Sequence, residues 1–431
     1  MAKSKHYLLC FYFIVFTNFL YLLFSKFDYT GLQSDRAGAS LLYLALLACT
    51  YCAVIYQLIL KRDVAFALLA KSTALWLFLL SSVISYLLAG ASDLSVMRYV
   101  LYLLTISAGL LLASQYSLDD ICEQFFYTGR AMLVLYFLMY PLFAGKIDYD
   151  ELGRATLIGV TSYAGLFPHK NTAALVFSLV LIVSLSRFIA FSNSTTRRSS
   201  LIVIIGSMIA IVMAGAVGAF LTLIVSLGAS SLCAAFLRAR TSYLAVALAL
   251  VLFAAIGLFA IGEQDFLEFF GRSTNLTGRT ELYELWPYFF WQKPLFGYGF
   301  SGFFGSPGQA ADYLSELTRG HGQYSTFEST YLDILIQFGL VGGMLLSWIL
   351  LRALLNAVLI FRLSGADYRL FPLLFMVFTL IASILGSGLT EQNFIVVCFT
   401  FWMYFSRGEN ERPYRTAGSE FRIRSQHHAR P

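Results

Sequence analysis

The strongest constraint on this chain of 431 residues is a series of apolar runs, each close to the length of a helix that crosses a membrane. Such a helix needs roughly 20 predominantly apolar residues. The hydrophobic fraction is 58% and the charged fraction only 13%, so the chain has more apolar surface than one water-soluble core can bury. The pattern predicts an all-α polytopic membrane protein with about twelve transmembrane helices, near residues 7–25, 40–60, 65–90, 98–116, 130–145, 171–192, 200–216, 217–237, 243–262, 329–351, 370–388 and 391–406.

One boundary in this series needs a decision. The segment 200–237 is a single apolar block that is too long for one helix, and we divide it at Gly215–Gly218. With that division the chain reads as transmembrane helices 1–9 in residues 1–262, with a first long loop at 146–170. A second long loop of 263–328 follows, then helices 10–12 in 329–406 and a basic tail in 407–431.

The distribution of Lys and Arg predicts the orientation, because these residues collect in cytoplasmic loops. With both termini in the cytoplasm, 19 of the 30 Lys and Arg residues lie inside, 10 lie outside, and Lys71 falls within a span. Both long loops are then outside. Extra or missing spans in the 200–237 block would place the basic tail on the wrong side, so the twelve-helix interpretation is self-consistent.

Cationic side chains in the two long loops run against this bias and are therefore candidate functional residues. Together they favour an anionic ligand at the outer face, above all a phosphate or pyrophosphate of a lipid. The alternative is that they only anchor the loops to lipid phosphates. The residues concerned are Arg154, His169, Lys170, Arg272, Arg279, Lys293, Arg319 and His321.

Three motifs lie in these loops. In the first, Arg154 precedes Gly165 by ten intervening residues, and Pro168-His169-Lys170-Asn171 follows at the mouth of a span. The second runs from Gly278-Arg279 through Trp286 to Pro294-Leu-Phe-Gly-Tyr-Gly299. Its apolar residues recur at helical spacing, which predicts an amphipathic helix on the membrane with Arg279, Glu281 and Glu284 on or near the wetter side. In the third, ten residues separate Glu328 from Gly339-Leu-Val-Gly342.

In order, spacing and topology, these motifs resemble the O-antigen ligase and O-antigen/exopolysaccharide polymerase superfamily of bacterial envelope proteins. The resemblance covers about residues 150–400, and the earlier spans match in hydropathy alone. It implies a multi-pass protein of the bacterial inner membrane that acts as a glycosyltransferase at the periplasmic face. The expected donor is a glycan on undecaprenyl pyrophosphate, and the lipid pyrophosphate is the leaving group.

The resemblance also implies roles for individual residues. Glu328, Arg154 and Arg279 match positions expected to be catalytic. The expected substrate-binding residues are His169, Lys170, Arg319, His321 and Trp286. Its implied partners are an acceptor glycan or lipid, membrane lipids and a chain-length regulator, with no nucleic acid, no cofactor and no metal.

Two positions depart from the family pattern. The family usually has His where this chain has Glu328, and that His is thought to act on the acceptor hydroxyl. A carboxylate can accept the same proton. Three alternatives are therefore open: Glu328 is the base, His321 seven residues upstream has taken the role, or the activity differs. Family ligases also tend to carry an Arg near residues 210–220, whereas Met213–Gly218 contains none. This difference favours a polymerase over a ligase.

A lipid-linked oligosaccharide flippase or other transporter is the main alternative from another class. Twelve spans suit it, but the two halves show no convincing repeat, and few ionisable residues fall at mid-membrane depth, where coupling sites usually lie.

Overall fold

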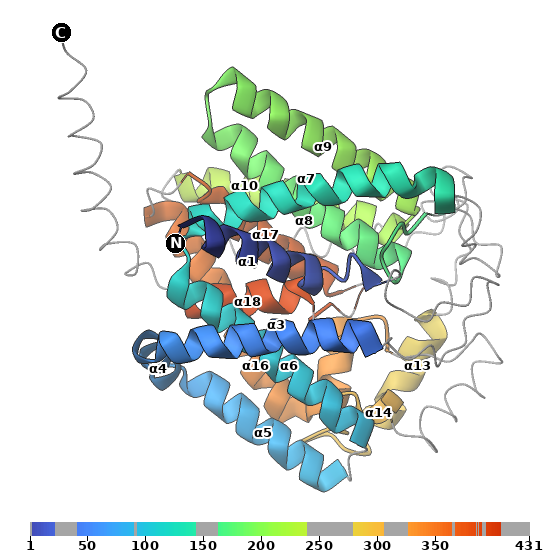
Figure 1. Ribbon diagram of the computed structural model, residues 1–431. Helices are drawn as coiled ribbons and strands as arrows, with labels where there is room; N and C mark the ends of the chain where they lie inside the picture. Colours follow the sequence, from blue (N-terminus) through green and yellow to red (C-terminus); the bar gives the residue numbers. More distant parts are fainter. Residues whose placement is uncertain are drawn as a thin grey trace.

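The computed structural model describes residues 2–21, 41–89, 93–143, 163–238, 279–305, 326–363, 367–384, 386, 388–389 and 394–406. Within these residues the fold is all-α, and no strand is present. The long helices run roughly alongside one another, and the short helices α13 and α14 lie at one end of the bundle (Figure 1). The helices are α1 (Ala2–Phe16), α3 (Leu41–Leu60), α4 (Arg62–Ala70), α5 (Thr73–Ala89), α6 (Asp93–Gln115), α7 (Leu118–Phe143), α8 (Lys170–Ala190), α9 (Ser194–Ala214), α10 (Val217–Arg238), α13 (Arg279–Phe290), α14 (Gly302–Gly305), α16 (Thr330–Leu363), α17 (Leu370–Ala382) and α18 (Ile395–Phe405).

Six of the described helices are long and apolar enough to cross a membrane, or seven if α4 and α5 together form one span. Three shorter apolar helices add to these, at His6–Phe16, Leu370–Ala382 and Ile395–Phe405. The predicted span 243–262 and the basic tail lie outside the described residues. The fold is thus that of a multi-pass membrane protein, and the total of about twelve spans stays a prediction.

The centre of the bundle is formed by α8 and α18. Every residue of α18 is buried, and α8 is buried along most of its length. α18 packs against α6 and α16, while α8 forms an antiparallel pair with α9. Many helices with exposed apolar side chains surround this core, as expected where lipid rather than water is the solvent.

The division of the block 200–237 is confirmed. α9 ends at Ala214 and α10 begins at Val217. Gly215 caps α9 in the left-handed conformation, with φ 66°, which costs glycine little. The turn is therefore encoded by one residue within a continuous apolar run.

Several other boundaries differ from the prediction, and α16, for example, ends at Leu363 instead of residue 351. α7 begins at Leu118, twelve residues before the predicted span. Ser117 and Asp120 cap its start reciprocally, because the Asp120 N–H donates to Ser117 Oγ and the Ser117 hydroxyl donates to the Asp120 carboxylate. Lys71 was predicted inside a span but lies exposed at the break between α4 and α5, whose axes bend by 81°. Apolar length alone cannot detect such a break.

Side-chain contacts define two ends of the bundle. At the Arg187 end, the end of α8 contacts the starts of α7 and α9 and the segment before α17. At the Glu328 end, the start of α16 contacts the end of α17, and α13 packs against α16. The start of α8 and the turn after α9 lie at the end opposite Arg187, because α8 and α9 are antiparallel.

Candidate functional site

The predicted amphipathic helix is present as α13, and its apolar side packs on α16. Leu282, Phe289 and Phe290 are buried in a cluster with Phe327 and Ile336, while Glu284 is exposed as expected. The Trp286 indole N–H donates to the Leu332 carbonyl, 3.2 Å away, and its ring stacks on Phe290 with centroids 4.7 Å apart. Trp286 therefore fixes α13 against the first turn of α16.

Glu328 lies two residues before α16, at a point that several contacts hold in place. Its backbone is left-handed, with φ 56°, and its side chain is part-buried. The Glu328 N–H donates to Thr326 Oγ1, and the Tyr283 hydroxyl of α13 donates to the Glu328 carbonyl. Next along the chain, the Thr330 hydroxyl and N–H donate to the Gly386 carbonyl at 2.6 and 2.8 Å. The backbone that carries the Glu328 carboxylate is therefore held between α13, α16 and the segment after α17.

A break in α16 receives the glycine-rich loop of the second motif. At Gly339 the backbone leaves the helical region, with φ 65° and ψ −169°. The carbonyls of Ile336 and Gln337 are released from the helix and accept from the N–H groups of Tyr298 and Gly299, at 2.8 and 2.9 Å. On the other side of the break, Leu340 and Val341 donate to the carbonyls of Pro294 and Leu295. Backbone N–H and C=O groups that lose their helical hydrogen bonds inside an apolar bundle need other hydrogen-bond partners, because no water is there to replace them.

Glycine is required at this junction for two reasons. A Cβ on Gly339 would lie 2.3 Å from the Leu295 backbone, and one on Gly297 would lie 2.5 Å from the Ile336 oxygen. Both glycines also have positive φ angles, which side chains rarely adopt. The second and third motifs therefore form one unit, in which the loop is paired with the helix break.

The same loop continues to a cation on α6. Arg98 Nη1 donates to the Ser301 hydroxyl, 2.6 Å away. The Ser301 N–H donates to the Gln337 side-chain oxygen at 3.1 Å, and the Tyr86 hydroxyl on α5 donates to the Phe300 carbonyl at 3.0 Å. Arg98 was missed as a site candidate. The signal for it in the sequence is a single Arg near the mouth of an otherwise apolar span.

The described part of the first motif lies where α8 begins. A Cβ on Gly165, which has φ 64°, would meet the Tyr136 ring at 2.5 Å. The Tyr163 N–H donates to the Met213 carbonyl, which places this segment beside the turn between α9 and α10. His169 caps α8, because its Nδ1 accepts from the Asn171 N–H at 3.1 Å. Lys170 is the first residue of α8 and is part-buried.

The structure therefore describes four of the eight predicted site residues with their side chains. Glu328 and Trp286 come together at the α13–α16 contact, and His169 and Lys170 lie at the start of α8. For Arg279 only the backbone is described, as the first residue of α13. Arg154, Arg319 and His321 lie outside the described residues. No group of three or more His, Cys, Asp or Glu side chains that could hold a metal ion occurs within the described part of the chain.

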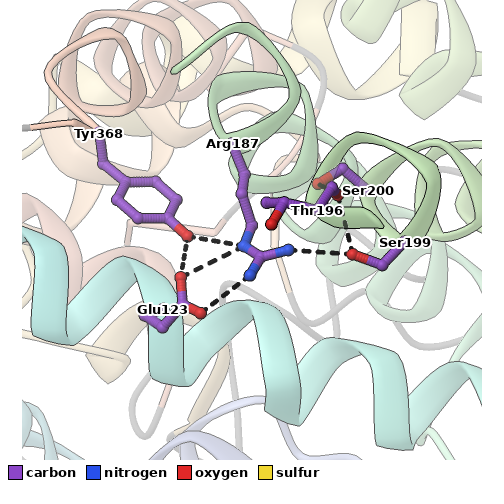
Figure 2. A network of polar contacts seen from close by, with 6 residues as sticks. All are labelled: Glu123, Arg187, Thr196, Ser199, Ser200 and Tyr368. Atoms are coloured by element: carbon purple, nitrogen blue, oxygen red, sulfur yellow. Dashed lines mark hydrogen bonds and ion pairs between the residues drawn. The ribbon is translucent and has the colours of Figure 1, made fainter. Parts of the chain in front are cut away.

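A separate polar network lies at the Arg187 end (Figure 2). The Arg187 guanidinium donates to both oxygens of Glu123, at 3.2 and 3.0 Å, to the Tyr368 hydroxyl at 3.0 Å and to Ser199 Oγ at 3.1 Å. Tyr368 donates to Glu123 in turn, and the Arg187 charge lies 4.3 Å from the Phe126 ring centre. This network uses its donors and acceptors on one another, which is typical of a structural clamp between helices.

The charge of Glu123 is stabilised by its partners. Burial by itself would raise the pKa of the Glu123 carboxyl, but the hydrogen bonds from Arg187 and Tyr368 and the Arg187 charge lower that pKa below its ordinary value. Burial and the adjacent Glu123 raise the pKa of the Tyr368 phenol well above its ordinary value. The pair therefore stays ionised and the phenol stays neutral at physiological pH.

Comparison with known proteins agrees with the motifs. Residues 200–347 match a family model described as O-Antigen ligase. No curated protein gave a significant match to the chain. The matched segment includes most of α9, then α10, α13, the glycine-rich loop and the start of α16, and so contains both Arg279 and Glu328. The match confirms the resemblance to the O-antigen ligase and polymerase superfamily and supports an O-antigen ligase or polymerase-type activity on lipid-linked glycans.

Proposed function

We propose that this chain is a membrane glycosyltransferase that polymerises O-antigen or exopolysaccharide repeat units at the periplasmic face of the bacterial inner membrane. Its donor is a glycan on undecaprenyl pyrophosphate, and its acceptor is another lipid-linked repeat unit. The observation that carries the proposal is the family match, because it spans the α13–α16 unit that holds Glu328 in a fixed position.

The proposed reaction needs one base and a stabilised leaving group. The oxygen of the acceptor hydroxyl forms a bond to C1 of the donor sugar, and Glu328 accepts the proton that this hydroxyl loses. The bond between C1 and the pyrophosphate oxygen breaks, and its electron pair leaves with the pyrophosphate. Arg154 and Arg279 stabilise the negative charge that develops there. Since the leaving group comes from the lipid, no nucleotide sugar takes part, and the step proceeds without a metal.

The choice of polymerase over ligase is supported by the α9–α10 turn. Met213–Gly218 forms a tight turn beside Tyr163 and contains no Arg, whereas family ligases tend to carry one in this region. The description of the matching family favours the second candidate, a ligase that transfers the glycan to a lipid A-core sugar. The two activities differ in the acceptor alone.

The product distinguishes these possibilities. The purified protein, reconstituted in membranes, is given a lipid-linked repeat unit with or without a lipid A-core acceptor. A polymerase yields longer glycans on undecaprenyl pyrophosphate without the core acceptor, and a ligase yields glycan on the core. Movement of intact lipid-linked units across the bilayer with no change in glycan length would instead identify a flippase and contradict the proposal.

A further inference from the structure

Arg98 is a cation near the start of a candidate membrane span, and the proposed mechanism does not use it. It is the third residue of the candidate span Val96–Gln115 and is part-buried. Its hydrogen bond to Ser301 goes to a neutral hydroxyl. Among the side chains that the structure describes, which do not include that of Asp93 at the start of α6, no carboxylate lies within ion-pairing distance of Arg98. By contrast, Arg187 at the opposite end binds Glu123.

An arginine in this position is costly without an anion. The guanidinium stays charged in proteins and offers five N–H donors in a planar fork. Among the described side chains, one of these donors is used, on Ser301. Ionisable groups within membrane segments are expensive and usually serve a ligand or a partner. A phosphate matches both the charge and the fork geometry.

Arg98 is held beside the end of the glycine-rich loop through its hydrogen bond to Ser301. Ser301 has a left-handed backbone, with φ 55°, and is held by Gln337 of α16. Tyr86 holds the preceding carbonyl of Phe300. Because residues 294–299 pair with the break at Gly339, the hydroxyl that contacts Arg98 is part of the same rigid unit as α13 and the start of α16.

We propose that Arg98 binds a phosphate group of a membrane lipid at the Glu328 end of the bundle. The inference rests on the proposed function in one respect: it makes the pyrophosphate of the lipid-linked donor the expected source of that phosphate. A phospholipid head group has the same chemistry, and the experiment separates the two. Arg98 would add a fixed positive charge, supplied by α6, to those of the long loops.

The rival explanation is that Arg98 only anchors Ser301. Three variants of the full chain in lipid nanodiscs distinguish the two: Arg98→Gln, Arg98→Lys and Ser301→Ala. Dissociation constants are measured for undecaprenyl pyrophosphate, for undecaprenol and for phosphatidylglycerol. Thermal unfolding of each variant shows whether it is folded, and Arg98→Lys keeps the charge if Arg98→Gln proves unstable.

If Arg98 binds phosphate, Arg98→Gln weakens undecaprenyl pyrophosphate binding by about tenfold or more. The affinity of Arg98→Lys for undecaprenyl pyrophosphate then lies between those of the wild type and Arg98→Gln, because the lysine ammonium keeps the charge but lacks the planar fork of donors. Ser301→Ala weakens this binding less than Arg98→Gln does, because the guanidinium charge remains, and undecaprenol binding changes in none of them. Weakened phosphatidylglycerol binding with unchanged undecaprenyl pyrophosphate binding assigns the phosphate to a phospholipid.

Two outcomes overturn the inference: unchanged affinity for both phosphate lipids in Arg98→Gln, or an equal loss in Ser301→Ala. These binding measurements do not depend on turnover. A wild-type protein that binds through Arg98 but transfers no glycan would contradict the proposed function and leave the phosphate site in place.

Discussion

At the scale of single residues, Glu328 has a backbone that is held in an uncommon conformation. A left-handed conformation is uncommon for a residue other than glycine and costs on the order of 1–2 kcal/mol. It persists here because Thr326, Tyr283 and the anchored Thr330 hold the backbone on both sides. A held backbone limits the positions that the carboxylate can reach, which suits a residue that must meet a substrate hydroxyl.

Substitution tests the role of Glu328 as base. Glu328→Gln keeps the size and most of the hydrogen bonding but cannot accept the proton, so turnover should fall on the order of 10²–10⁴-fold. Glu328→His, which restores the residue usual in the family, should retain measurable activity. Rates per folded molecule decide the matter, with abundance and melting temperature as controls. Normal turnover in the Gln variant would move the assignment to His321, and His321→Ala would then have to abolish turnover.

Substitutions of Arg154 and Arg279, the two arginines of the long loops, test the stabilisation of the leaving group. Arg154→Ala and Arg279→Ala should each abolish glycan extension while the protein still inserts in the membrane, because the leaving pyrophosphate loses a stabilising charge. Arg→Lys at either position should rescue only part of the rate. Glycan length on gels, together with membrane abundance, provides the measurement. Full activity in both Ala variants is incompatible with this role.

At the scale of helices and loops, the pairing between the glycine-rich loop and α16 is the feature that organises the candidate site. It joins residues 294–299 to residues 336–341 by four backbone hydrogen bonds. Without the loop, the break at Gly339 would leave carbonyl and N–H groups unsatisfied inside an apolar bundle, at a cost of several kcal/mol each. The loop and the break are therefore mutually dependent.

Glycine substitutions test this dependence. Gly339→Ala combines a forbidden backbone conformation with a contact of 2.3 Å to the Leu295 backbone, so it should destabilise the protein by about 2 kcal/mol or more. Gly302→Ala is a matched control, because no atom of the described residues lies within 4 Å of the added Cβ. Thermal unfolding in detergent should show a clear loss for Gly339→Ala and little change for Gly302→Ala. Equal melting temperatures would show that the loop is not held by the break.

The elements also show how far the sequence alone could lead. Apolar length predicted most of the helices, and Gly215 was found because an overlong block has to turn somewhere. The break between α4 and α5 escaped because Lys71 interrupts a run that stays apolar on both sides. The loop–helix pairing and the Arg98–Ser301 contact were beyond reach, since each joins segments distant in sequence through hydrogen bonds that leave no periodic pattern.

At the scale of the whole molecule, the two ends of the bundle differ in how they treat charge. The Arg187 end satisfies its cation internally, through Glu123, Tyr368 and Ser199. The Glu328 end presents Arg98, whose partner among the described side chains is the neutral Ser301 hydroxyl. This asymmetry is expected of a protein that holds its helices together at one end and binds an anion at the other.

The clamp at the Arg187 end should give a pH-dependent contribution to stability. Because the pKa of Glu123 is lower in the folded protein, the clamp contributes fully above the unfolded Glu pKa of about 4.3 and is lost as the pH falls through the folded value. Breaking it by Glu123→Gln should cost on the order of 3 kcal/mol near neutral pH. Melting temperatures of both proteins should converge as the pH falls below about 4, and a pH-independent difference would contradict the assignment.

The arrangement of the ends leads to a prediction about topology. The described cations that were assigned to the cytoplasm, such as Arg187, Arg197 and Arg369, lie at or next to helix termini of the Arg187 end. Successive long helices run in opposite directions between the two ends of the bundle. Once one end is assigned to one side of the membrane, the side of each described helix terminus follows. The excess of Lys and Arg in the loops assigned inside then places the Arg187 end in the cytoplasm and α13 outside.

Reporters at both ends test this orientation. Tyr288→Cys on α13 and Lys61→Cys before α4 place thiols at exposed positions, with 59% of Tyr288 accessible. In intact cells a membrane-impermeant maleimide applied from the periplasm should label position 288 above the unsubstituted protein, and position 61 only after the membrane is opened. A phosphatase fused at residue 420, which is active only outside, should be inactive. Labelling of position 61 in intact cells, or an active fusion at 420, would invert the molecule and move Glu328 and Arg98 to the cytoplasmic side, where a periplasmic polymerase cannot use them.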